Sequence, residues 1–301
     1  MRGGMTSSGL PSGAGGAVAH VFSVDVEDYF QVSAFERAVD PATWATMPTR
    51  VERNTDILLD ALDRAATRGT FFTLGWVADR YPAIVRRIAA AGHEVASHGW
   101  SHRRLTTLGP AELREELRRS KGVLEDLAGQ EVIGFRAPSF SIVPGGEWAF
   151  DALLEEGYRY DSSLFPIRRP DYGYPAAPAE PHAIERPAGT LMEFPLATTV
   201  FLGARLPAAG GGYLRHLPYG VMRRAFREHG ERGIPAMFYV HPWEVDPGQP
   251  RVPVGRLTSL RHYGGLARTL PRIERLLGEF RFTTAADALG LRPAAFAVGA
   301  R

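Results

Sequence analysis

The chain contains no cysteine among its 301 residues. Disulfide bonds and thiolate chemistry are therefore excluded, and any bound metal must be held by histidine, aspartate or glutamate. The sequence also lacks blocks of like charge, since 35 Lys and Arg residues and 33 Asp and Glu residues are spread along it. This pattern gives little support to nucleic-acid binding. No apolar run approaches the roughly 18 residues that a membrane span requires, and we therefore expect a soluble, cytoplasmic protein.

The two ends of the chain differ in composition from its body. Residues 1–18 are rich in Gly, Ser and Ala and have no apolar run of signal-peptide length, which predicts a disordered leader. Residues 19–290 contain no internal repeat and no linker, so we expect one domain there, followed by a short tail over residues 291–301. Hydrophobic residues make up 45% of the chain, enough for a large core.

Strand-like and helix-like segments alternate along the chain. Apolar runs such as 20–26 and 236–240 predict buried strands, and amphipathic segments such as 50–68 and 110–127 predict helices. The alternation indicates an α/β fold with a parallel sheet wrapped by helices, and it favours a βα barrel. A doubly wound open sheet is the alternative, but no glycine fingerprint follows the first strand. The proline-rich residues 166–187 interrupt the rhythm and predict an irregular segment.

Two histidines four residues apart, His98 and His102, follow the strand predicted over residues 93–97. Imidazole is the commonest neutral metal ligand, and such a pair supplies two of the three protein ligands of a catalytic zinc site. A pair alone is more often incidental. His93 is expected to make a structural hydrogen bond instead. Apart from His241, which is considered below, the other histidines carry no comparable context and are interpreted as structural or surface residues. They are His20, His182, His216, His229 and His262.

Three carboxylates, Asp25, Glu27 and Asp28, stand at the end of the first predicted strand. On an extended strand Asp25 and Glu27 point to the same side. They could form a solvated acidic loop or cap a helix. Alternatively, one of them binds a metal together with His98 and His102, and another remains free as a base. A divalent ion there would lower the pKa of water and polarise a carbonyl oxygen.

Three further polar residues, Arg136, Asp161 and His241, come directly after predicted strands. In a βα barrel such positions share the rim that carries catalysis. Arg136, which is always protonated, could keep Asp25 ionised and oriented. His241 could be a general acid whose pKa is raised by Asp161. Each residue also has an ordinary explanation: a surface arginine, a buried core histidine, and a turn cap for the two serines that follow Asp161.

The turn after Arg136 contains Pro138, which stiffens it and would let backbone N–H groups near Phe140 face an oxyanion. Aromatic residues near the ends of strands and loops could form a surface on which a sugar stacks, although such residues are as often core plugs. The candidates are Trp100, Phe140, Trp148, Phe165, Tyr172 and Trp243. From their positions, residues 31–48 and 166–187 are expected to shape the substrate entrance.

Taken together, five motifs resemble those of the polysaccharide deacetylases, a metal-dependent carbohydrate esterase family, over residues 21–289. The likeness is nearest to the branch found beside exosortase and exopolysaccharide genes. It implies a distorted, incomplete (β/α)7-type barrel. The motifs are Ser-Val-Asp-Val-Glu-Asp-Tyr-Phe (23–30), Ser-His-Gly-Trp-Ser-His (97–102), Phe-Arg-Ala-Pro-Ser-Phe-Ser-Ile (135–142), Tyr-Asp-Ser-Ser-Leu-Phe-Pro (160–166) and Tyr-Val-His-Pro-Trp-Glu (239–244).

The resemblance also implies a role for each polar residue. Val26 stands where the family usually has a second aspartate, so Glu27 is the expected metal carboxylate, with Asp28 in reserve. Zinc is the expected ion, with cobalt, nickel or manganese as alternatives. The remaining roles are Asp25 as the base, His98 and His102 as metal ligands, Arg136 as the group that steadies the base, Asp161 as the residue that tunes the acid, and His241 as the acid.

These inferences lead to one hypothesis and three alternatives. The hypothesis is hydrolysis of an N-acetyl group on an amino sugar of a polysaccharide, oligosaccharide or glycoside. Phe140, Pro138, Trp100 and Trp243 are the residues expected to contact the substrate or its oxyanion. The alternatives are a hydrolase of a small cyclic or acyclic amide, as in allantoinases, a deacetylase of a small acetylated metabolite, and a glycan-binding protein without activity.

Overall fold

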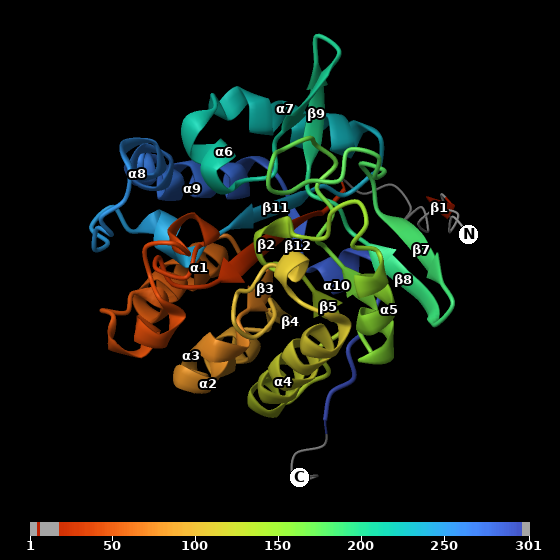
Figure 1. Ribbon diagram of the computed structural model, residues 1–301. Helices are drawn as coiled ribbons and strands as arrows, with labels where there is room; N and C mark the ends of the chain where they lie inside the picture. Colours follow the sequence, from red (N-terminus) through yellow and green to blue (C-terminus); the bar gives the residue numbers. More distant parts are fainter. Residues whose placement is uncertain (1–4, 7–17, 297–301) are drawn as a thin grey trace.

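The computed structural model describes residues 5–6 and 18–296 of the chain. Its centre is a sheet whose strands are mostly parallel and buried, with helices outside it (Figure 1). Strands covered on both faces are buried along their whole length, as in His20–Val26. The parallel strands are β2 (His20–Val26), β3 (Thr70–Thr73), β4 (Glu94–Ser97), β5 (Gly134–Phe135), β6 (Tyr160–Asp161), β8 (Gly189–Glu193), β11 (Met237–Val240) and β12 (Phe282–Thr283).

The parallel strands follow the spatial order β8-β6-β5-β4-β3-β2-β11, and β12 pairs with the start of β2. Leu196, which follows β8, forms an isolated parallel bridge with Met237 of β11. The two ends of the series therefore meet through a single bridge and not through a continuous ladder. This arrangement is a distorted, incomplete βα barrel, and it confirms the fold class that the sequence predicts.

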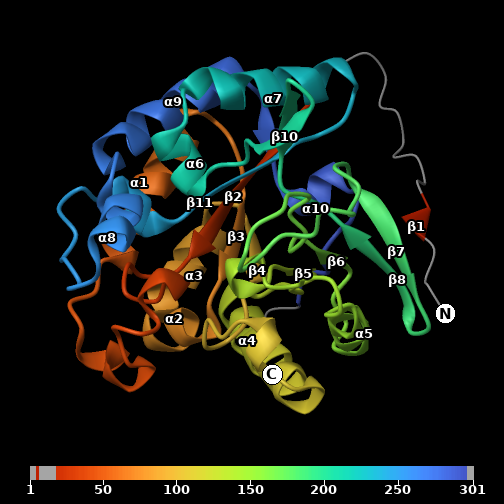
Figure 2. The same ribbon diagram turned by 45° about the horizontal axis from the view of Figure 1, so that its top comes forward.

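Ten α-helices are described, and Figures 1 and 2 show them around the outside of the sheet. Helix α4 illustrates how the sequence sets their ends: Pro110 occupies the first turn, Glu112 accepts a hydrogen bond from the amide of Gly109, and Gly129 ends the helix at φ 68°. The helices are α1 (Val51–Arg64), α2 (Gly75–Arg80), α3 (Pro82–Ala90), α4 (Pro110–Ala128), α5 (Trp148–Glu155), α6 (Gly211–His216), α7 (Tyr219–Glu231), α8 (Arg256–Tyr263), α9 (Thr269–Glu279) and α10 (Ala285–Ala288).

Some elements differ from the sequence prediction. The proline-rich segment predicted to be irregular contains β7 (His182–Arg186), which pairs antiparallel with β8 at the edge of the sheet. Proline is tolerated there because Pro181 and Pro187 flank the strand and leave its ladder intact. The hairpin formed by β9 (Thr198–Phe201) and β10 (Ala204–Pro207) was also not predicted, nor were helices α2, α6 and α8.

The segment predicted as a loop over residues 31–48 is held in place by its own apolar cluster. It contains two short 3-10 helices, Ser33–Phe35 and Pro41–Thr46. Phe35 and Trp44 are buried and pack in one cluster with Trp243. The start of this segment is thereby fixed beside the carboxyl end of β11.

The ends of the described chain lie against neighbouring elements. Met5–Thr6 form β1, which pairs antiparallel with β7, and the rest of the predicted leader up to residue 17 lies outside the described residues. Residues 291–296 of the predicted tail run beside the end of α4, where the amide of Glu131 donates to the carbonyl of Ala294 at 2.8 Å. In the described part of the chain, no helix combines the length and apolarity needed to cross a bilayer.

Candidate active site

The carboxyl ends of β2, β4 and β11 surround a cavity of about 390 Å³. Its walls include Asp25 near the end of β2 and Glu27 directly after it, His98 and His102 after β4, and His241 after β11. Parallel strands place their carboxyl ends at one rim, so residues more than 200 positions apart in sequence meet there. The convergence predicted for these five side chains is present in the structure.

Glu27, His98 and His102 form a group that could hold a metal ion. One ligand atom from each lies within 4.8 Å of the others, and all three side chains are buried. The Oε2 atom of Glu27 lies 2.6 Å from Nε2 of His102. Two imidazoles and one carboxylate are the ligand set of many catalytic zinc sites, so the chemistry of the donors fits a divalent ion of this kind.

The hydrogen bonds around this group leave the metal-facing atoms available. Nδ1 of His98 lies 2.8 Å from the carbonyl oxygen of Arg136, to which it donates, so Nε2 keeps a free lone pair. Oε1 of Glu27 accepts a hydrogen bond from the indole of Trp243 at 3.2 Å, whereas the buried Oε2 faces Nε2 of His102. Burial lowers the pKa of His98 to about 4, which keeps this imidazole neutral, as a ligand must be.

The electrostatic environment also keeps the carboxylate charged. Burial raises the pKa of Glu27, but the neighbouring His102 and His241 outweigh it and lower the pKa to about 2. A charged carboxylate beside a neutral imidazole provides negative potential in a buried place. Such a place favours a cation.

The loop that carries His98 and His102 is held by Glu116 of α4. Its carboxylate accepts hydrogen bonds from the amides of Trp100 at 2.8 Å and Ser101 at 2.9 Å, and from the hydroxyl of Ser101. His102 has φ 56°, a left-handed conformation that is costly for a residue with a side chain. Glu116 therefore helps to hold the strained backbone at His102. The sequence did not indicate this role of Glu116.

Asp25, the predicted base, is paired with a fully buried guanidinium. Nη1 of Arg136 lies 2.5 Å from Oδ1 of Asp25 and 2.9 Å from Oγ of Ser23. Nη2 of Arg136 donates to Oγ of Ser162 at 2.9 Å. With its guanidinium held from several sides, Arg136 fixes the orientation of Asp25, and Oδ2 of Asp25 lies 3.9 Å from Nε2 of His241.

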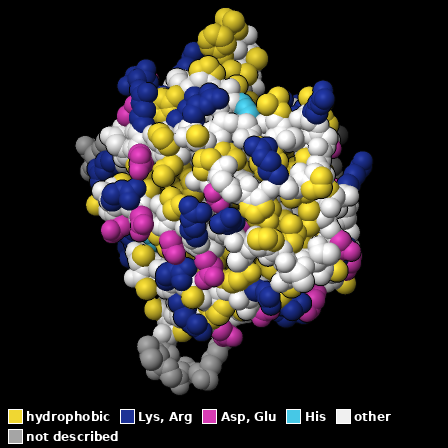
Figure 3. Space-filling view, turned by 90° about the vertical axis from the view of Figure 1, so that its left-hand side faces the viewer, with side chains coloured by type: hydrophobic (Ala, Val, Ile, Leu, Met, Phe, Trp, Pro, Cys, Tyr) yellow, Lys and Arg dark blue, Asp and Glu magenta, His cyan; other side chains and the backbone are white. Residues whose placement is uncertain are grey.

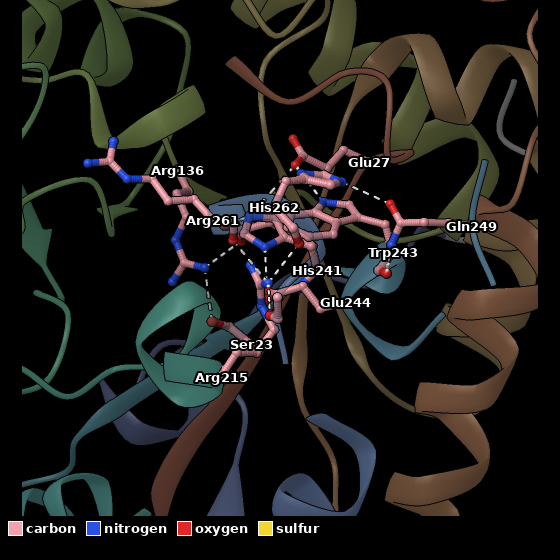
Figure 4. A network of polar contacts seen from close by, with 12 residues as sticks. Ser23, Glu27, Arg136, Arg215, His241, Trp243, Glu244, Gln249, Arg261 and His262 are labelled. Carbon is pink, nitrogen blue, oxygen red and sulfur yellow. Dashed lines mark hydrogen bonds and ion pairs between the residues drawn. The ribbon is translucent and has the colours of Figure 1, made fainter. Parts of the chain in front are cut away.

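His241 is oriented by a buried ion pair behind it (Figure 4). Nδ1 of His241 lies 2.7 Å from Oε1 of Glu244, and Oε2 of Glu244 lies 2.7 Å from Nε of Arg215. Nε2 of His241 faces the cavity, 3.7 Å from Oε1 of Glu27. Burial lowers the pKa of His241, but the carboxylates of Glu27 and Glu244 outweigh it and raise the pKa to about 9.

The partner predicted for His241 is wrong. Asp161 accepts hydrogen bonds from Oγ of Ser163 at 2.6 Å and from its amide at 3.2 Å, so it caps a turn. Burial raises the pKa of Asp161, which lies beside Glu193. Glu244 occupies the place next to Nδ1 of His241. Glu244 is the last residue of the His-Pro-Trp-Glu motif, but the motif does not indicate that its carboxylate contacts Nδ1 of His241.

The reserve metal ligand is also wrong. Oδ2 of Asp28 accepts hydrogen bonds from Oγ1 of Thr49 at 2.7 Å and from the amides of Arg50 at 2.8 Å and Val51 at 3.1 Å. Asp28 thus caps the start of α1 and is not part of the metal-ligand group. Glu27 and Asp28 lie beyond the end of β2, where the chain turns and directs the two side chains to different neighbours.

The predicted substrate residues separate into two groups. Phe140 and Trp243 line the cavity, together with Tyr172. The amide of Phe140 itself donates to the carbonyl of Ala137 at 3.0 Å, so an oxyanion donor in this turn would be a neighbouring N–H group. The other candidates are absent from the walls of the cavity, because they pack against the protein interior: Trp100 under the guanidinium of Arg119, and Pro138, Trp148 and Phe165 in or against the core.

Several cavity residues were not identified from the sequence. The ring of His262, predicted to be structural or superficial, lies in the wall of the cavity and stacks on Trp243 with ring centroids 4.2 Å apart. By contrast, His93 accepts a hydrogen bond from the amide of Gly69 at 3.1 Å, as predicted. Both segments predicted to shape the entrance contribute wall residues. The additional wall residues are Val32, Ser33, Ala34, Arg104, Ser139, Asp171, Arg215, Tyr239, Thr258 and Arg261.

The fold and the site together describe a distorted βα barrel whose rim carries a group of residues that could hold a metal ion. Residues 41–144 match the polysaccharide deacetylase family, and residues 162–290 match a domain of unknown function, DUF3473. Over residues 41–144 the chain is therefore similar to the polysaccharide deacetylases, and two of the curated relatives that it matches carry the names peptidoglycan-N-acetylglucosamine deacetylase and chitooligosaccharide deacetylase.

Three similar proteins illustrate the relationship. A peptidoglycan-N-acetylglucosamine deacetylase of Bacillus cereus is 37% identical over 90 residues, which are 30% of each chain. A structure from Mycobacterium smegmatis that carries the name polysaccharide deacetylase superposes with a TM-score of 0.59, at 23% identity, and covers 98% of this chain and 99% of its own. Puue allantoinase superposes with a TM-score of 0.62 at 17% identity, covering 95% and 93%. The two structural matches show a shared fold.

The matched regions are partial. The chain spans less than half the length of the first curated relatives it matches, from 30% to 46%.

Proposed function

We propose that this protein is a metal-dependent hydrolase that removes the N-acetyl group from an amino sugar within a glycan. The observation that carries the proposal is the convergence of Glu27, His98 and His102 beside Asp25 and His241 in one cavity. The relatives that act on N-acetylated glycans support the choice of substrate class.

The residues have complementary roles in this reaction. Glu27, His98 and His102 would hold the divalent ion, which supplies Lewis-acid polarisation of a carbonyl and acidifies water. Asp25, kept in place by Arg136, accepts the proton of the attacking water. His241 presents Nε2 to the cavity and donates a proton to the departing amine. General acid and base catalysis each contribute about 10²–10⁴-fold.

The surroundings of the cavity favour a substrate larger than one acetamide. A second hollow of about 600 Å³ shares Arg104, Asp171 and Tyr172 with the first, so the two hollows adjoin along these residues to give a groove. Tyr172 and Phe140 offer aromatic surface in the part of the groove that lies next to His241. Such a groove supports binding of a neighbouring sugar and favours an oligosaccharide over a small cyclic amide.

The direct test measures metal content and acetate release on the same purified sample. N-acetylglucosamine oligomers and peptidoglycan fragments are compared with hydantoin and allantoin as substrates. We expect acetate release from an N-acetylated glycan, loss of activity with a chelator, and recovery with zinc, cobalt, nickel or manganese. Undiminished release by the metal-free protein would contradict the metal role, and turnover of the cyclic amides alone would favour the allantoinase-like alternative.

Variants separate catalysis from binding. Asp25→Asn is expected to keep its metal and its circular dichroism spectrum but to lose acetate release by about 10²–10⁴-fold. Asp79→Asn, an exposed site on α2, is the matched control. If a wild-type sample that binds glycan shows no turnover of any substrate, and Asp25→Asn binds equally well, the protein is a glycan-binding module instead.

A further inference from the structure

The hairpin of β9 and β10 projects from the body of the protein with an apolar tip (Figure 1). Val200 is 51% exposed, Phe201 is 50% exposed and Leu202 is 91% exposed. Three consecutive large apolar side chains at this exposure are unusual, since single exposed apolar residues are the rule. Figure 3 shows the tip as a hydrophobic point standing above the surface.

The backbone of the tip is strained by its sequence. Leu202 has φ 49° and Gly203 has φ 77°, the pattern of a two-residue turn in which both central residues are left-handed. Asn, Asp and Gly are the residues that fit the first of these positions, whereas leucine is disfavoured. An apolar side chain is therefore kept in full solvent exposure at a cost to the fold, and stability does not explain its presence.

The protein surface around the base of the hairpin is basic. Arg205 on β10 is exposed, and the guanidinium of Arg224 on α7 lies 5.7 Å from the ring centroid of Phe201. Helix α7, which packs against β9, also carries the exposed Arg227. Glu228 is ion-paired with Arg224 at 2.6 Å and bonded to Thr199, so this pair is neutral and the positive charge here comes from Arg205 and Arg227. Figure 3 shows Lys and Arg side chains on the surface just below the apolar point.

The shape of the feature decides between a protein and a lipid partner. A stable protein–protein interface buries about 800 Å² on each side, which a convex three-residue tip cannot supply. An apolar point above a basic surface matches the boundary of a bilayer, where apolar side chains enter about 5–10 Å and cationic side chains meet anionic headgroups. We propose that Val200, Phe201 and Leu202 insert into the surface of a lipid bilayer that carries anionic headgroups.

The proposal is tested with vesicles and a variant that removes the apolar tip without harming the turn. In Phe201→Ser/Leu202→Asn, asparagine suits the left-handed position, so the unfolding midpoint is expected to equal or exceed that of wild type. Wild type should float with phosphatidylglycerol-containing vesicles, and the variant should bind at least tenfold less. Leu257→Ser/Leu260→Ser on α8, where the leucines are 72% and 66% exposed, is the matched control and should bind like wild type.

Two further results would support the charge component. Binding by wild type should weaken as salt rises, and it should fall at least tenfold when phosphatidylcholine replaces phosphatidylglycerol. Acetate release from a soluble oligosaccharide should be the same in both variants as in wild type, because the tip lies outside the cavity. This readout keeps a failure of membrane binding distinct from a failure of the proposed activity.

Three outcomes would overturn the proposal. The first is that wild type binds vesicles of no composition. The second is that the α8 control variant loses as much vesicle binding as the tip variant. Self-association of wild type in the absence of lipid, abolished in the tip variant, would show that a second copy of this chain covers the tip instead.

Discussion

The carboxylate of Glu244 lies 2.7 Å from Nδ1 of His241, on the side of the imidazole that faces away from the cavity. The same carboxylate is 2.7 Å from Nε of Arg215, whose Nη1 donates to the carbonyls of His262 at 2.7 Å and Gly264 at 2.8 Å. The contact makes Nδ1 a donor and directs Nε2 into the cavity. Glu244 thus positions the proposed acid without lining the cavity itself.

Replacement of this carboxylate should affect turnover more than binding. In Glu244→Gln the amide no longer stabilises a positively charged imidazole, and Arg215 loses its ion pair. We expect kcat to fall by roughly 10²-fold with little change in KM or metal content. Steady-state acetate release and metal analysis check this result. Glu279→Gln, which removes a surface partner of Arg275, is the control, and an unchanged kcat in Glu244→Gln would refute the positioning role.

Adjacent carboxylates at the end of β2 should give opposite results. Glu27→Gln removes a ligand atom and should abolish stoichiometric metal binding while the fold is kept. Asp28→Ala should retain one metal per chain but lower the free energy of unfolding by about 1–3 kcal/mol, because the donors of Thr49, Arg50 and the buried Val51 lose their acceptor. Metal analysis and urea unfolding distinguish the two. Metal loss in Asp28→Ala would return this residue to the ligand set.

The loop between the two histidines should depend on Glu116. In Glu116→Gln the side chain keeps one acceptor oxygen and loses the other, so the hydrogen bonds to Trp100 and Ser101 cannot all form. We expect metal affinity to weaken about 10–100-fold, as for other groups that orient ligands. Competition with a chelator measures this change. Its neighbour Glu115, whose partner is Arg118 on the surface, provides the control Glu115→Gln. Equal affinity in the two variants would exclude a role for Glu116.

The stability of the protein should fall in mild acid, in part because of His93. Burial lowers the pKa of His93 from 6.5 to about 4 in the folded state, with Arg68 adding to the effect. Between these values the unfolded chain binds more protons than the folded chain, so the free energy of unfolding decreases as pH falls from 6.5 toward 4.

The variant His93→Gln removes the titrating group and keeps an acceptor for the amide of Gly69. Its free energy of unfolding should therefore decrease less than that of wild type between pH 7 and pH 5, measured by urea unfolding at each pH. Other buried histidines leave a remaining slope in both proteins. Parallel pH curves for wild type and variant would show that His93 does not contribute.

The sequence predicted the parallel sheet and the rim residues well, because both follow from strong local patterns. Apolar runs marked β2 and β11, and a polar residue directly after each run marked the rim. The same patterns could not predict the β9–β10 hairpin, since its tip is apolar where a turn normally has asparagine or glycine.

Contacts between side chains were harder to predict than positions. Asp161 and Glu244 both lie near strand ends, and only the path of the backbone decides which of them reaches Nδ1 of His241. Asp28 and Glu27 are neighbours in sequence, yet the turn after β2 sends one to α1 and the other to the histidines. Such outcomes depend on tertiary geometry, which spacing along a chain does not encode.

Arg136 touches both halves of the proposed chemistry with different parts of one residue. Its carbonyl accepts from the imidazole of His98, and its guanidinium holds the carboxylate of Asp25. Since a carbonyl is common to every amino acid, a substitution of Arg136 changes the group beside Asp25 but keeps an acceptor for Nδ1 of His98. One position thus supports both the proposed base, through its side chain, and His98, through its backbone, and a substitution there directly affects only the base.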